Sequence, residues 1–178
     1  TIALAAAANA TIAASEPVLQ RSRGLDPDAG ERAAAELALL PGPHARALAG
    51  AIRARDWNAR RVQGVTTFNE PRALQALMLA LRDDDPEVRR IAVWGLAEMR
   101  PAPEAIAIPA VSRMLSDVSP EVRAEAAGAI GDFESVENSR SVEKLLLHHP
   151  SAPVRLRAAH ALGDIQDPDS RPTLERAL

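Results

Sequence analysis

Residues 85–99 read DPEVRRIAVWGLAEM, and two later segments repeat this pattern, SPEVRAEAAGAIGDF at 119–133 and SAPVRLRAAHALGDI at 151–165. The three copies align without gaps, and a Val-Arg pair recurs in them at spacings of 34 and 32 residues. A weaker copy, DWNARRVQGVTTF, begins at Asp56. Self-similarity at a nearly fixed period of this size is typical of repeat architectures.

The apolar residues within each copy follow the period of an α-helix. Val88, Ala92 and Leu96 lie four residues apart, so they form one stripe along a helix. The same positions in the other copies hold Val122, Ala126, Ile130, Val154, Ala158 and Leu162. A second amphipathic stretch, such as SVEKLLL, follows each copy. We therefore predict that each repeat is a helical hairpin.

Helix-start and helix-end residues recur at fixed places in the copies. Side-chain oxygens that can cap a helix stand at the start of each copy, at Asp56, Asp85, Ser119 and Ser151. Glycines near the ends predict the turn that follows each helix, at Gly95, Gly131 and Gly163. The expected helices cover 29–40, 43–54, 57–67, 71–82, 86–99, 103–116, 120–132, 139–148, 152–164 and 169–177.

A single hairpin cannot bury both of its faces, whereas hairpins stacked side by side share a continuous core. We therefore predict an all-α fold over residues 29–178, a right-handed α-solenoid of about four to five hairpins. The pattern D/S-x-x-V-R-x-x-A-x-x-x-[LI] resembles the HEAT-like repeats, especially the short bacterial type named after phycobilisome lyases, over residues 43–178. Because this family serves many roles, the resemblance indicates the fold and leaves the function open.

The resemblance also implies a role for the arginine of each Val-Arg pair. In the family, the helix that carries this pair lines the concave side, and its arginine bonds to carbonyls or carboxylates of the neighbouring turn. A stabilising ladder would then comprise Arg60, Arg89, Arg123 and Arg155, with Asp85 and Asp117 as acidic partners. The alternative is that this arginine row binds a ligand.

Other positions on the same helices differ in character from copy to copy. Six residues after the Val stand Trp94, Gly128 and His160, and three residues after it stand Ile91, Glu125 and Arg157. A constant apolar stripe beside a variable surface is what a protein-binding scaffold would show. The candidate partner-binding residues of the concave face are Trp94, Ile91, Arg90, Glu125, Arg157 and His160. Trp94 is interpreted either as an interface anchor or as filler between helices.

Composition argues against several classes of activity. The 178 residues include no cysteine, which excludes disulfides, thiolate metal sites and cysteine nucleophiles. The histidines, His44, His148, His149 and His160, lack metal-ligand spacing, and the His148-His149 pair reads as an exposed helix end. The sequence has no P-loop, G-x-S-x-G or H-E-x-x-H motif. We therefore expect no catalysis, metal, cofactor or small-molecule substrate.

Residues 1–28 are predicted to lie apart from the repeat domain. The Ala-rich segment 1–14 is either a helix packed on the domain or the tail of an export signal or membrane anchor. This segment is shorter than the roughly 20 residues that a bilayer span requires. The following stretch, SEPVLQRSRGLDPDAG, mixes proline, glycine and charge as a linker does.

We interpret the chain as a non-catalytic scaffold for a protein partner, an accessory or structural subunit, or a fragment, of a larger bacterial assembly. A periplasmic or membrane-associated place, for example in energy conversion or light harvesting, is favoured over the cytoplasm. One alternative is an enzyme subunit or chaperone similar to the bilin lyases of the same repeat family. The other is a HEAT-like nucleic-acid-binding protein, which the net charge of −3 does not favour.

Overall fold

The computed structural model describes residues 24–40, 43–56, 71–99 and 104–177, which form helices and no β-strand. The helices are α2 (Ala29–Ala38), α3 (Pro43–Ala54), α4 (Pro71–Ala80), α5 (Pro86–Glu98), α6 (Glu104–Met114), α7 (Pro120–Asp132), α8 (Ser139–His148), α9 (Ala152–Ile165) and α10 (Arg171–Ala177). Two short 3-10 helices, η2 (Val136–Asn138) and η3 (Pro168–Ser170), precede α8 and α10. The predicted all-α fold is confirmed.

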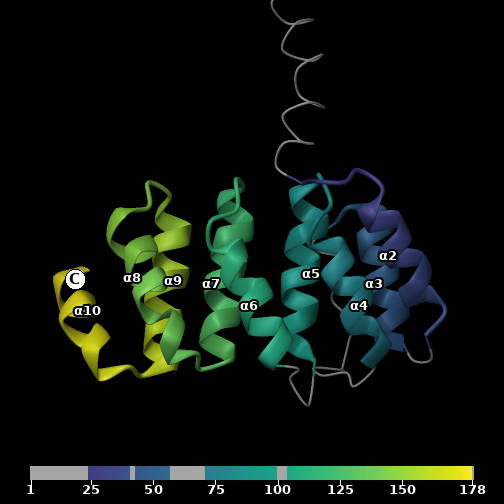
Figure 1. The fold of residues 1–178 in the computed structure, drawn as a ribbon. Coiled ribbons are helices and arrows are strands. Elements are labelled where there is room, and N and C mark those ends of the chain that lie inside the picture. Colours follow the sequence, from purple (N-terminus) through teal and green to yellow (C-terminus); the bar gives the residue numbers. More distant parts are fainter. Residues whose placement is uncertain (1–23, 41–42, 57–70, 100–103, 178) are drawn as a thin grey trace, which may run out of the picture.

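Consecutive helices pair into hairpins, and the hairpins stack in a row (Figure 1). The pairs are α2 with α3, α4 with α5, α6 with α7, and α8 with α9. Between neighbouring hairpins, α2 packs on α4, α3 on α5, α5 on α7, and α7 on α9. The short helix α10 contacts α8 at the end of the row. This arrangement is the predicted solenoid of stacked helical hairpins.

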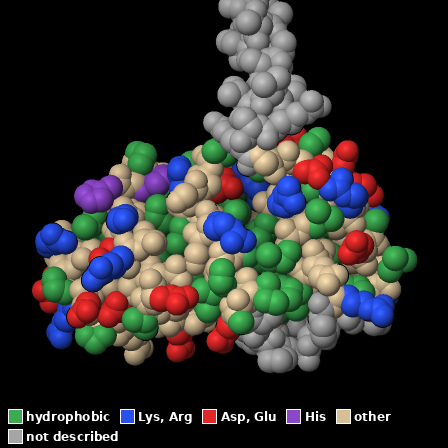
Figure 2. Space-filling model, in the orientation of Figure 1, with side chains coloured by type: hydrophobic (Ala, Val, Ile, Leu, Met, Phe, Trp, Pro, Cys, Tyr) green, Lys and Arg blue, Asp and Glu red, His purple; other side chains and the backbone are tan. Residues whose placement is uncertain are grey.

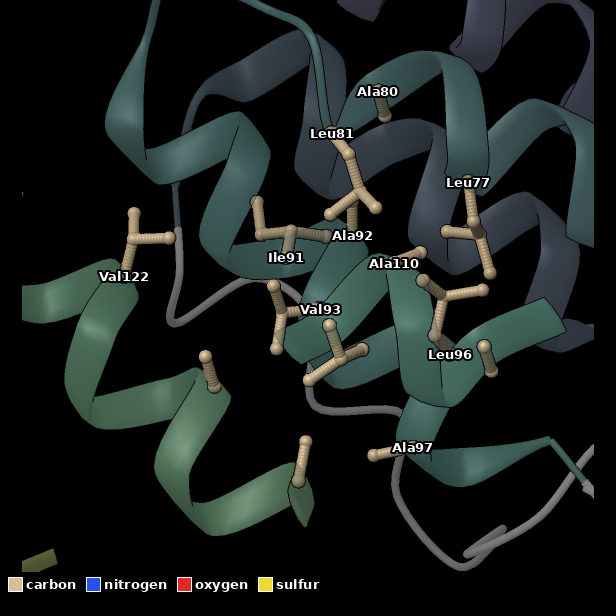
Figure 3. Packing of buried hydrophobic residues seen from close by; sticks show 14 of the residues in the cluster. Leu77, Ala80, Leu81, Ile91, Ala92, Val93, Leu96, Ala97, Ala110 and Val122 are labelled. Atoms are coloured by element: carbon tan, nitrogen blue, oxygen red, sulfur yellow. The ribbon is translucent and has the colours of Figure 1, made fainter. Parts of the chain in front are cut away.

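A continuous apolar core runs along the stack. One connected cluster of buried side chains extends from Ala33 of α2 to Ile165 of α9. Figure 3 shows its central part, where Leu77 of α4, Leu96 of α5 and Val122 of α7 lie among other buried side chains of the stack. All residues of the predicted stripe are at most 1% exposed. Full burial of such a Val or Leu side chain stabilises a fold by about 1.5–3 kcal/mol.

The predicted helix caps are confirmed in two copies and wrong in one. The Asp85 carboxylate accepts a hydrogen bond from the Glu87 amide at 2.8 Å, and the Ser119 hydroxyl accepts one from the Val122 amide at 3.4 Å. Ser151 makes no capping bond. Its second helical residue is Pro153, which lacks the amide proton that Asp85 uses in the first copy.

All three glycines expected to end helices lie inside them. A Cβ built on Gly95 of α5 would lie 2.9 Å from Leu77 Cδ2, and one on Gly131 of α7 would lie 2.9 Å from Ala161 Cα. Gly95 and Gly131 permit close helix packing, whereas nothing lies within 4 Å of a Cβ built on Gly163. The prediction that these three glycines form the turns is wrong. Non-glycine residues take the left-handed conformation where three helices end, namely Arg55, Glu134 and Gln166.

Part of the predicted linker is bonded to the repeat domain. The Asp26 amide donates to the Arg82 carbonyl at 2.7 Å, which ties this segment to the turn after α4. The segment 1–14, the helix expected at 57–67 and its Arg60 lie outside the described residues. None of the described helices combines the length and apolar character that a membrane span needs.

The close α7–α9 contact predicts opposite effects of alanine at two helical glycines. Gly131→Ala should lower the free energy of unfolding by about 1–3 kcal/mol, because its methyl group meets the α9 backbone. Gly163→Ala in α9 should raise it by about 0.5–1 kcal/mol, because nothing lies within 4 Å of the added Cβ and alanine favours helix. Urea unfolding measures both values, and equal effects of the two substitutions would contradict the close contact.

Candidate functional site

An arginine links the α4–α5 turn to the α6–α7 turn. Arg89 of α5 is 1% exposed, and its Nε and Nη2 donate to the two carboxylate oxygens of Asp117 at 2.8 and 2.7 Å. Its Nη1 donates to the carbonyls of Asp83 and Asp84, at 2.9 Å each. Asp117 also accepts the Ser119 amide at 2.8 Å. Arg89 therefore connects its own turn to the next one, as the ladder interpretation predicts.

The preceding turn is held in a similar way through Asp83, which the sequence analysis missed. Arg55 donates to the fully buried Asp83 carboxylate at 3.1 Å, and both arginine–aspartate pairs span 28 residues. The amides of Gly30 and Asp85 donate to the same carboxylate at 2.6 and 2.8 Å. Burial raises the pKa of Asp83, and these bonds and Arg55 oppose that shift. The predicted ladder member Asp85 pairs with Arg55 at 3.0 Å, not with Arg89.

The last two arginines of the ladder differ from Arg89. Arg155 of α9 donates through Nη1 to the carbonyls of His149 and Pro150, at 2.8 and 2.9 Å, which repeats the bonds of Arg89 within its own turn. Arg123 of α7 has a buried Nε with no hydrogen-bond partner. In the turn that follows Arg123, His149 stands at the position that corresponds to Asp117. No carboxylate therefore joins Arg123 to the turn between α8 and α9.

The two adjacent histidines lie in different environments. His148 is exposed, whereas His149 is only 9% exposed, so its predicted exposure is wrong. The reason is its place in the turn, where its Nδ1 accepts the Ser151 amide at 3.1 Å. His149 Nδ1 thus accepts the Ser151 amide in the same way that the Asp117 carboxylate accepts the Ser119 amide.

Several predicted partner-binding residues come together on α5, α7 and α9. Arg90 Nε lies 3.7 Å from Glu125 Oε2, which joins α5 to α7. Arg157 of α9 lies directly over Gly128 of α7, so that a Cβ on Gly128 would overlap its guanidinium group. His160 is exposed on α9. The α5–α7–α9 face is our name for the surface formed by Arg90, Trp94, Glu125, Arg157 and His160.

Two apolar candidates have different positions. Ile91 has no exposed surface and belongs to the core, so its prediction as a partner-binding residue is wrong. It lies three residues after Val88 and shares that residue's buried side of α5. Trp94 is half-buried and packs against the core. Its partial burial does not decide between the two interpretations, because one part of the side chain packs on the core and another part is exposed.

The sequence analysis missed an apolar area where α9 lies beside α8 and α10. Leu156 of α9 is 61% exposed and borders a groove of about 530 Å³ that also contains Leu146 and Leu174. Leu156 follows Arg155 as Arg90 follows Arg89, so the alignment of the copies could have indicated its exposure. Among the described residues, no three His, Asp or Glu side chains form a group that could hold a metal ion.

The buried ladder pair predicts a large effect of removing one partner. Asp117→Ala should lower the free energy of unfolding by about 3–5 kcal/mol, because Arg89 would keep a buried charge without a carboxylate. Arg171→Ala is the control, since its pair with Glu175 is largely exposed and contributes at most about 0.5 kcal/mol. Chemical denaturation compares them, and a cost for Asp117→Ala no larger than the control would show that the buried pair does not stabilise the stack.

Comparison with known proteins agrees with this geometry. The protein family described as HEAT repeats matches the chain twice, at residues 45–109 and at residues 108–178. The comparison with curated proteins gave no match. The similarity to the phycobilisome-lyase subtype stays a prediction. Stacked hairpins, their shared core and the two family matches over most of the sequence lead to one conclusion: the chain belongs to the HEAT-repeat family.

Proposed function

We propose that this chain is a non-catalytic scaffold that binds a protein partner through the α5–α7–α9 face. HEAT repeats commonly mediate protein interactions, because a row of packed helices offers an extended and rigid surface. A rigid surface loses little conformational entropy when a partner binds. The family membership thus supports a binding role in general, and the side chains of this face support its location.

The observation that carries the proposal is a half-buried tryptophan four residues after Arg90 on α5, the helix to which Arg90 and Glu125 join α7. Trp94 is held by the core beneath it, and Arg90 and Glu125 link α5 to α7. Arg157 extends from α9 across Gly128. Tryptophan and arginine dominate many interface energies when their surroundings exclude water. This face therefore combines an apolar anchor with charged groups of both signs.

The buried aspartates of the chain support a structural interpretation of its acidic residues. Asp83 and Asp117, which a catalytic hypothesis would examine first, bond to arginines and backbone amides of the turns. The narrower role of an accessory or structural subunit in a larger bacterial, membrane-associated assembly remains part of the proposal and derives from the sequence alone.

Native co-purification followed by mass spectrometry tests the proposed surface. The full chain serves as bait, with Trp94→Ala and Arg157→Glu as separate variants. We expect each variant to retain at least tenfold less of the wild-type partner, because a tenfold loss requires only about 1.4 kcal/mol of binding energy. Arg171→Glu is the matched control, since it reverses the charge of an exposed arginine on α10, and its capture should equal that of the wild type.

Circular dichroism and thermal unfolding establish that each variant is folded before capture is compared. Equal capture by the wild type and both folded variants would exclude the α5–α7–α9 face as the binding surface.

A further inference from the structure

A pocket lies at the turn between α8 and α9, where the ladder lacks its carboxylate. Its volume is about 350 Å³, and its lining residues are Arg123, Lys144, Leu145, His148, His149 and Pro150. No acidic side chain is among these residues. Figure 2 shows histidine and basic side chains together at the end of α8 and α9 where this turn lies. The lining therefore favours a negatively charged ligand.

Two side chains that line the pocket carry buried nitrogens without hydrogen-bond partners. Arg123 Nε and His149 Nε2 are both buried without a hydrogen-bond partner. Because His149 Nδ1 accepts the Ser151 amide, the neutral ring carries its proton on Nε2. Buried N–H groups without acceptors are rare in folded proteins and call for an explanation such as a missing ligand. Both side chains line the same pocket.

The preceding turn shows which group would satisfy these donors. There, the Asp117 carboxylate accepts Nε and Nη2 of Arg89 and also the Ser119 amide. In the α8–α9 turn, His149 replaces that residue and accepts the Ser151 amide. The Ser151 amide thus has its acceptor, whereas Arg123 Nε has none. A planar carboxylate matches the fork of an arginine in two parallel hydrogen bonds, as it does at Asp117.

Glu121, an acidic residue that the charge of Arg123 influences, is already engaged. Glu121 accepts the Ser119 hydroxyl at 2.7 Å, and this bond is the main cause that lowers its pKa. The charges of Arg90 and Arg123 contribute less to that shift. Lys144 and His148 are exposed and lie on the pocket lining with Arg123. An incoming carboxylate would thus meet basic groups in the pocket and no competing acid in its lining.

We propose that this Arg123–His149 pocket binds the carboxylate of an Asp or Glu side chain from a protein partner. The ligand supplies the carboxylate that Asp117 provides in the preceding turn, with Arg123 and His149 Nε2 as its donors. The role in partner recognition rests on the proposed function above, whereas carboxylate binding by the pocket does not. Acidic segments of the partner would therefore contact the turns between α-helices as well as the α5–α7–α9 face.

NMR titration of the full chain with N-acetylglutamate α-amide tests carboxylate binding. The side-chain signals of Arg123 Nε–H and His149 should shift and saturate, because both groups gain an acceptor. N-acetylglutamine α-amide, which has the same shape without the charge, should leave them in place. Inorganic phosphate is a separate arm. The proposal is overturned if the glutamate probe causes no saturable shift, or if phosphate binds more tightly than the carboxylate.

Two substitutions separate binding from folding. Arg123→Gln should weaken glutamate binding at least tenfold by removing the charge. His149→Asp should weaken it equally while raising Tm, because the chain then supplies its own carboxylate to Arg123. Arg171→Gln on α10 is the control and should bind the probe like the wild type. Unchanged probe binding by folded His149→Asp protein would overturn the proposal.

The two proposals fail in distinguishable ways. If the wild type does not bind the glutamate probe and partner capture still depends on Trp94 and Arg157, only the pocket proposal is rejected. If the probe shifts the Arg123 and His149 signals saturably, the pocket proposal is supported. If partner capture is then independent of Trp94 and Arg157, the α5–α7–α9 face is rejected.

Discussion

A helix with two apolar sides cannot bury both of them against its hairpin partner alone. The helix α7 illustrates this constraint, because it packs on α6 within its hairpin and on both α5 and α9 in the neighbouring ones. The core consequently extends through the stack as one cluster. Each hairpin depends on its neighbours for stability, and the surfaces between core and solvent are repeated along the row.

Polar bonds between turns add a second, more specific connection. Where an aspartate stands two residues before the helix cap, as at Asp83 and Asp117, an arginine of the preceding repeat binds to it. Where His149 stands instead, Arg123 keeps an unpaired donor and a pocket opens beside it. One residue at an equivalent position therefore decides whether a turn is closed by the chain itself or is available to another molecule.

The sequence predicted what depends on periodicity and missed what depends on packing between repeats. The stripe through Val88, Ala92 and Leu96 is buried because helical spacing alone places these residues on one side. A glycine that ends a helix and one that admits a neighbouring helix look alike in sequence, so Gly131 was misinterpreted. Only the position of α9 against α7 separates the two roles.

The candidate site shows the same limit. The ladder pair Arg89–Asp117 was predictable because the family resemblance supplies the relation between neighbouring turns. Ile91 was assigned to the surface because its register position also holds Glu125 and Arg157, which are less buried. The pocket escaped notice, although the change from Asp117 to His149 was visible in the aligned copies. Its meaning depends on Arg123, which lies 26 residues before His149 in the sequence.

Amide hydrogen exchange after a core substitution tests most directly whether stability passes from neighbour to neighbour. Val154→Ala leaves a cavity in α9, where the valine side chain is 1% exposed. The stacked-hairpin account predicts faster exchange in α8 and α9, a smaller increase in α7, and no change in α2 and α3. The same acceleration in every helix from α2 to α10 would contradict it and would indicate a single cooperative core.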